Sequence, residues 1–183
     1  MSGAALEASF APCSAPMRVM RWSEFEACRS IPRSSEALDL LEVTPGSGLT
    51  VIFVSHDWWN RDEGGVATAP DFASGEQQHL KYRVICSGVA ALIASEGLRA
   101  AEVALWIDWF SIEQDDAVQK ARGIESMIHF TTWSQYMLIP LRTPHAEAML
   151  QEGEDEPEAA YYPEDIAGYG TRGWTRVEYF LFR

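Results

Sequence analysis

Leu49-Thr50-Val51-Ile52-Phe53-Val54-Ser55 is the stretch that decides the fold of this chain. A nearly unbroken run of β-branched and apolar residues of this length is typical of a strand buried on both faces of a sheet. Two later runs have the same character, Val103-Ala104-Leu105-Trp106-Ile107 and Tyr136-Met137-Leu138-Ile139-Pro140-Leu141. The sequence therefore predicts three core strands.

Helical patterns separate these strands. Between the first two, apolar residues recur at helical spacing from Leu80 to Ile93, and Gly97 suits the end of a helix. Between the second and third, Asp115-Asp116 opens a helix whose apolar stripe runs from Ile124 to Thr131. This alternation predicts an α/β fold, an open sandwich with a parallel sheet and right-handed crossovers.

The residues before the first core strand are less regular. Residues 1–17 are rich in Ala, Ser and Pro, and residues 22–29 predict a short helix that begins at Ser23. We expect two parts: an amino-terminal arm with a short helix that packs on the domain (residues 1–48), and one α/β domain (residues 49–183).

Composition narrows the function classes. The 183 residues carry a net charge of -13, which would repel a phosphate backbone, so we expect no nucleic-acid partner. Eight acids and no Lys or Arg fall between Glu147 and Asp165, which predicts a solvated acidic loop. No run approaches the roughly 18 apolar residues that a membrane helix needs. Three cysteines without C-x-x-C spacing, with Cys86 as a core thiol of the first predicted helix, indicate a reducing compartment. A cytoplasmic protein with no membrane partner is expected.

Polar and aromatic residues follow each predicted strand. Ser55-His56-Asp57-Trp58-Trp59 follow the first, Asp108-Trp109 follow the second, and Arg142 follows the third. Ligands of open parallel sheets bind at the carboxyl ends of the strands. We therefore expect a ligand site there.

A carboxylate lies on an apolar stripe near the end of the chain. Residues 171–182 predict a helix in which Glu178 shares one face with Trp174, Leu181 and Phe182. Burial there would raise the pKa of Glu178 unless a hydrogen-bond donor supports it. The alternative is a partly exposed Glu178 that pairs with an arginine of the same segment: Arg172, Arg176 or Arg183.

Other chemistries have less support. His56, Asp57 and Asp108 could bind a divalent metal, but their spacing matches no metal motif, and helix capping is the simpler role of Asp115-Asp116. Consecutive strand residues point to opposite faces, which disfavours Ser55-His56-Asp57 as a hydrolytic triad. No Gly-rich phosphate loop follows a strand. A metal-dependent hydrolase or transferase is therefore the least favoured hypothesis, and we expect no metal.

Three blocks of the sequence resemble, in matching order, a HET-type (heterokaryon incompatibility) domain of the TIR-like superfamily. They are residues 51–58, then Leu105-Trp106-Ile107-Asp108 with Gln114-Asp115-Asp116, then residues 172–178. The first strand is similar to the F-I-S opening of TIR domains. The last block is similar to their W-C-x-x-E helix, with Thr175 in place of the usual Cys. The similarity covers roughly residues 50 to 183.

The resemblance implies a flavodoxin-like three-layer sandwich with a central parallel sheet. For enzymatic members it also implies cleavage of NAD between nicotinamide and ribose, with NAD as the substrate and no cofactor. Glu178 occupies the position of the catalytic glutamate. The residues expected to bind NAD are Ser55, His56, Asp57, Trp58, Asp108, Trp109 and Trp174.

This chemistry has a physical rationale. Neutral nicotinamide leaves readily from a cationic pyridinium, so the step needs no general acid, but it does need stabilisation of the ribosyl cation. A carboxylate in a site without water supplies that stabilisation. Trp58, Trp59 or Trp109 could stack on the nicotinamide ring, or could simply form a wall of the core.

Many members of this superfamily act as assembly modules in defence or cell-death signalling. NAD hydrolysis in such a pathway is therefore our first hypothesis, and a non-catalytic module that acts through homotypic association is the second. A homo-oligomer built on TIR-type contacts is expected. TIR domains continue beyond the helix that contains Glu178, so the carboxyl half is either truncated here or replaced by residues 18–45.

Overall fold

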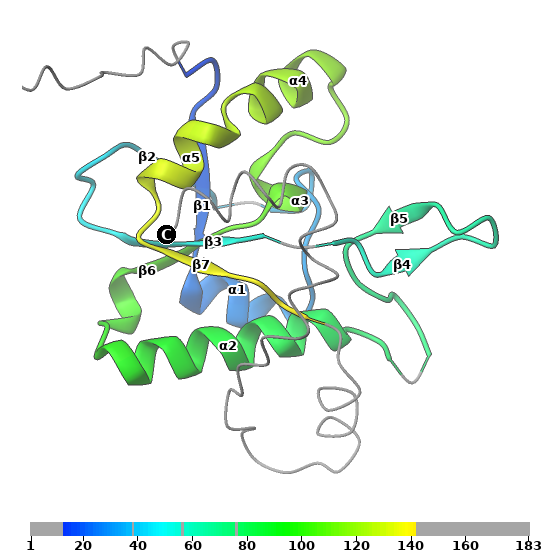
Figure 1. Ribbon diagram of the computed structural model, residues 1–183, viewed down its shortest axis with the longest axis horizontal. Coiled ribbons are helices and arrows are strands. Elements are labelled where there is room, and N and C mark those ends of the chain that lie inside the picture. The colour runs from blue at the N-terminus through cyan, green and yellow to red at the C-terminus, as the bar shows by residue number, and fades with distance from the viewer. Residues whose placement is uncertain (1–12, 38, 56, 76, 142–183) are drawn as a thin grey trace, which may run out of the picture.

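The computed structural model describes residues 13–37, 39–55, 57–75 and 77–141 (Figure 1). The strands are β1 (Met17–Arg21), β2 (Leu41–Val43), β3 (Thr50–Val54), β4 (Asn60–Arg61), β5 (Ala67–Ala69), β6 (Val103–Trp106) and β7 (Tyr136–Leu138). The helices are α1 (Trp22–Cys28), α2 (Leu80–Glu96), the 3₁₀ turn η1 (Ala100–Glu102), α3 (Asp108–Ser111), α4 (Ala117–Glu125) and α5 (Met127–Trp133).

The main sheet is mixed and has the strand order β2-β1-β6-β3-β7. β3 lies in the middle of the parallel part and pairs with β6 on one side and β7 on the other. β1 is antiparallel to both β6 and β2. The three predicted core strands and their parallel pairing are therefore confirmed, and two antiparallel strands extend the sheet beyond β6.

These two additional strands come from residues 1–48, where the sequence predicted one helix and no strand. The predicted helix is confirmed as α1, which begins one residue earlier than expected. β1 escaped prediction because Arg18 and Arg21 interrupt its apolar residues. In the sheet both arginines hydrogen-bond to backbone carbonyls, Arg18 Nε to Ser111 at 3.2 Å and Arg21 to Ala101 at 3.0 Å.

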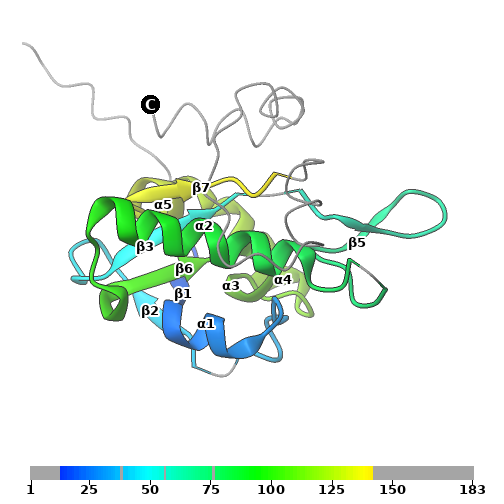
Figure 2. The same cartoon turned by 90° about the horizontal axis from the view of Figure 1, so that it is seen from below.

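Each face of the main sheet has its own hydrophobic core. Side chains alternate along a strand, so Ile52 of β3 packs toward α1 and α2, whereas Phe53 packs toward α5. Phe53 also stacks on Trp106 of β6, with ring centroids 4.3 Å apart and an interplanar angle of 8°. The result is three layers, with α1 and α2 below the sheet and α5 above it in Figure 1. Figure 2 looks at the sheet from below, so α2 lies in front of it there.

The crossover helices follow their predicted boundaries closely. α2 ends where expected, because Gly97 takes a left-handed conformation (φ 62°) and its N–H donates to the carbonyl of Ile93. The second predicted helix is divided into α4 and α5 at Ser126. Ser126 is fully buried, and its Oγ accepts the N–H groups of Ser14 and Ala15, both at 3.0 Å. This break therefore anchors the residues that precede β1.

Cys86 lies on α2 and packs against the core on the face of the sheet that α1 and α2 cover. Burial raises the pKa of its thiol to about 11, so the thiol is neutral at physiological pH. This agrees with its predicted role as a core thiol.

Among the helices that the structure describes, none combines the length and the apolar character needed to cross a membrane.

Replacement of a buried residue of β1 tests whether this strand is integral to the fold. Val19 has 0% exposure. Val19→Ala removes two methyl groups from a packed site and should lower the free energy of unfolding by about 2 kcal/mol in urea titrations. Val118→Ala, at a position of α4 that is 61% exposed, is the matched control. It should change the free energy of unfolding by less than about 0.5 kcal/mol. Equal effects of the two substitutions would contradict the pairing of β1 with the sheet.

Candidate functional site at the carboxyl ends of the parallel strands

The three parallel strands end at the same edge of the sheet, and several predicted site residues follow them there. Ser55 directly follows β3, is 4% exposed, and donates its N–H to the carbonyl of Leu138 on β7 at 3.0 Å. Asp57 and Trp58 come next in the chain, and Asp108 begins α3 just after β6. Parallel pairing therefore gathers these residues at one edge, as the sequence predicted.

Two tryptophans that follow neighbouring strands meet at this edge. The rings of Trp58 and Trp109 have centroids 4.9 Å apart and are inclined at 83°, an edge-to-face contact. Both residues are half-buried, so the pair remains partly accessible. The guanidinium carbon of Arg33 lies 5.0 Å from the centroid of the Trp109 ring. A cation and an aromatic ring therefore fix Trp109 at this edge.

The Gln114-Asp115-Asp116 block shapes the chain beyond α3. Gln114 Nε2 donates to the carbonyls of Asp108 at 2.9 Å and Ile112 at 3.1 Å. Asp116 caps α4, because its Oδ1 accepts the N–H groups of Val118 at 2.8 Å and Gln119 at 3.1 Å in the first turn of that helix. Asp115 does not cap α4 but forms an ion pair with Arg33, at 2.5 Å. Helix capping is therefore confirmed for Asp116 and wrong for Asp115.

The loop after α1 forms one wall of this site, which sequence reasoning missed. Ser34 Oγ accepts the N–H of Gln114 at 3.0 Å and donates to the carboxylate of Glu113 at 3.2 Å. Together with the Arg33–Asp115 pair, these bonds join two loops about 80 residues apart in the chain. No local pattern indicates such contacts, because each residue is an ordinary loop residue in its own segment.

A buried lysine is the second feature that sequence reasoning missed. Lys81 lies in the first turn of α2 and has 0% exposure. Its ammonium donates to the carbonyl of Asp57 and lies 4.9 Å from the centroid of the Trp59 ring. Nothing in the sequence signals this burial, because a lysine on an amphipathic helix is normally solvated.

Part of the predicted site lies outside the described residues. His56, Trp174 and Glu178 are in this group, as are Arg142 and the acidic stretch 147–165. The structure therefore does not test whether these residues lie at the strand ends. Within the described parts of the chain, no group of three or more His, Cys, Asp or Glu side chains could hold a metal ion.

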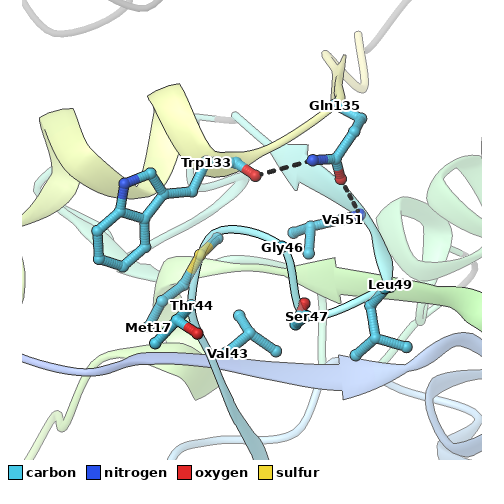
Figure 3. Close-up of a pocket in the computed structure, with 10 residues that line it drawn as sticks. Met17, Val43, Thr44, Gly46, Ser47, Leu49, Val51, Trp133 and Gln135 are labelled. Atoms are coloured by element: carbon cyan, nitrogen blue, oxygen red, sulfur yellow. Dashed lines mark hydrogen bonds between the residues drawn. The ribbon is translucent and has the colours of Figure 1, made fainter.

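A small cavity of about 90 Å³ lies near the amino end of β3, away from the predicted site (Figure 3). Its walls include Met17, Val51 and Trp133. The Gln135 amide at its rim is already used, because it accepts the N–H of Val51 at 2.7 Å and donates to the carbonyl of Trp133 at 3.0 Å. The Gln135 amide is therefore not available to a ligand in this cavity.

Comparisons with protein-family models, with curated proteins and with solved structures each found no significant match.

The different roles of Asp115 and Asp116 can be separated by substitution. Asp116→Ala removes the cap of α4 and should lower the free energy of unfolding by about 1 kcal/mol. Asp115→Ala breaks an ion pair in which the Asp115 side chain is 56% exposed, so solvent screening should keep the loss below about 0.5 kcal/mol. Thermal and urea unfolding of both variants measures the difference. The reverse order would show that Asp115 carries the greater share of the stability.

Proposed function

We propose that this chain is a TIR-like domain that cleaves NAD at the bond between nicotinamide and ribose, within a defence or cell-death type signalling pathway. The observation that carries the proposal is the contact of Trp58 with Trp109 at the carboxyl ends of two adjacent parallel strands. An accessible aromatic pair at this edge suits a planar ring such as nicotinamide.

The strand order supports a flavodoxin-like arrangement. In the order of the chain, the three parallel strands lie second, first, third across the sheet, as β6, β3 and β7. In flavodoxin-like sheets the first three strands of the chain have this order. Such sheets bind ligands between the first and third strands, where the strand order reverses. Ser55 lies at that point, bonded through its N–H to β7.

The charge of the site favours the oxidised form of the nicotinamide ring. That ring carries a positive charge in NAD, and a tryptophan face attracts a cation by about 0.5–2 kcal/mol. Asp57, which pairs with Arg61 at 3.0 Å, and Asp108 stand at the same strand ends. Carboxylates beside the ring favour its cationic form over the neutral, reduced one.

The proposed reaction is a substitution at the ribose carbon C1′. The bond from C1′ to the ring nitrogen breaks, its electron pair stays on nitrogen, and nicotinamide leaves as a neutral molecule. Water then adds to C1′ and releases a proton. In this proposal the Glu178 carboxylate stabilises the positive charge that develops on the ribose.

Release of nicotinamide from NAD by the purified chain is the first test. Glu178→Gln keeps the shape of the side chain and removes its charge, so kcat should fall by about a hundredfold or more while NAD still binds. Glu125→Gln, at an exposed position of α4, is the matched control and should retain full turnover. Chromatographic measurement of nicotinamide gives both rates. Full turnover of Glu178→Gln would remove the catalytic assignment.

The aromatic pair is tested separately from the carboxylate. Trp58→Leu removes one ring of the pair and should raise KM for NAD about tenfold, in line with the usual contribution of an aromatic stack. Trp133→Leu removes a ring that lines the small cavity near the amino end of β3 and should leave KM unchanged if the variant is folded. Equal KM values for wild-type protein and Trp58→Leu would mean that the nicotinamide ring binds elsewhere.

A non-catalytic module that acts through homotypic association is the second candidate. The β4–β5 hairpin favours it, because the hairpin projects from the body of the protein (Figure 1) and places Val66 at 63% exposure. An exposed apolar side chain on a projecting element suits contact with another copy. Absence of nicotinamide release at every protein concentration, with a molecular mass that rises with concentration, would favour this candidate over NAD cleavage.

A further inference from the structure

A long excursion separates β3 from α2 and carries one of the two site tryptophans. It extends outward as the β4–β5 hairpin (Figures 1 and 2). Asp57 and Trp58 precede β4 on the outgoing leg, and Pro70 follows β5 on the returning leg. Residues 61–66 of this hairpin are all exposed. A short hairpin with so few buried side chains has little apolar packing of its own to fix its orientation. The position of Trp58 therefore depends on what holds the base of the excursion.

Lys81 occupies that base. Its buried ammonium donates to the carbonyl of Asp57 on the outgoing leg and to that of Pro70, 3.4 Å away, on the returning leg. The same ammonium lies 4.9 Å from the ring centroid of Trp59, and the Trp59 N–H donates to the Pro70 carbonyl at 3.1 Å. One cation thus connects both legs of the excursion to α2.

Asp71 fixes the start of α2, from which Lys81 extends. Its carboxylate is 7% exposed and accepts the N–H groups of Lys81 at 3.0 Å and of Tyr82 at 2.8 Å. It takes over the capping role at this end, because His79 at the N-cap position makes no side-chain capping bond. The returning leg and the first turn of α2 therefore hold each other in place.

We infer that Lys81 is a positioning residue for the ligand site, whose ammonium holds the Asp57-Trp58 segment in the orientation that places Trp58 against Trp109. A buried ammonium must keep its hydrogen bonds, because an unpaired charge inside a protein is costly. Its donors therefore keep the two carbonyls, and the legs that carry them, at fixed positions. An apolar side chain could fill the same space without fixing either leg. The identity of the ligand in this inference rests on the proposed function.

Lys81→Met tests this role, because methionine fills much of the space but donates no hydrogen bond. We expect KM for NAD to rise about tenfold while kcat changes less than about threefold, since the nicotinamide ring loses its fixed platform and the reacting groups remain. Amide hydrogen exchange should become faster at residues 57–72 and remain unchanged in β6. Lys120→Met changes the other lysine of the chain and should behave as wild type in both measurements.

Chemical rescue distinguishes positioning from simple filling of space. Lys81→Ala removes three methylenes and the ammonium, which together correspond to propylammonium. Added propylammonium should restore the wild-type KM and the slow exchange at residues 57–72 in Lys81→Ala. The methionine of Lys81→Met fills space without donating a hydrogen bond, and should restore neither. This comparison also covers the case in which Lys81→Met does not fold.

Each outcome bears on a different statement. Wild-type KM and wild-type exchange in Lys81→Met would overturn the inference. Faster exchange with an unchanged KM would also overturn it, because Lys81 would then hold the hairpin without affecting the site. If the wild-type protein releases no nicotinamide, the proposed function fails. In that case the exchange at Trp58 and Trp59 still decides whether Lys81 fixes this segment.

Discussion

Burial of β3 on both of its faces is the constraint on which the rest of the structure depends. Its side chains alternate between two separate cores, so each face needs a helical cover. Its two neighbours, β6 and β7, pair with it in parallel, and parallel pairing demands a crossover connection for each. The helices α2 and α5 meet both demands at once. The common direction of the three strands then gathers Ser55, Trp58 and Trp109 at one edge.

The parallel part of the sheet could be predicted because each of its strands has a recognisable local sequence pattern. The residues from Leu49 to Ser55 are apolar almost without interruption, and Gly97 and Asp116 mark helix boundaries by their own chemistry. β1 and β2 carry no such mark. β2 has only three residues, and β1 is held by partners far along the chain, with Met20 opposite Leu105. Tertiary pairing, not local propensity, makes them strands.

The candidate site divides in the same way. The rule that parallel strands present their carboxyl ends to ligands was enough to select Ser55, Asp57, Trp58, Asp108 and Trp109. It could not find Arg33 or Ser34, because their partners lie about 80 residues away. Lys81 was inconspicuous for another reason: a lysine in a helix is normally solvated, and only the folded chain reveals that carbonyls surround its ammonium.

The place of β1 in the sheet has a consequence for the chain as it is being made. Among the described strands of the main sheet β1 comes first in the chain, but its partner β6 follows only after residue 102. Until then one edge of β1 has unpaired backbone groups, and such edges recruit strands from other chains. Arg18 and Arg21 place two positive charges on those five residues, and charge on a free edge opposes this recruitment. The arginines that obscure β1 in the sequence are therefore charges of the kind that oppose pairing with another chain.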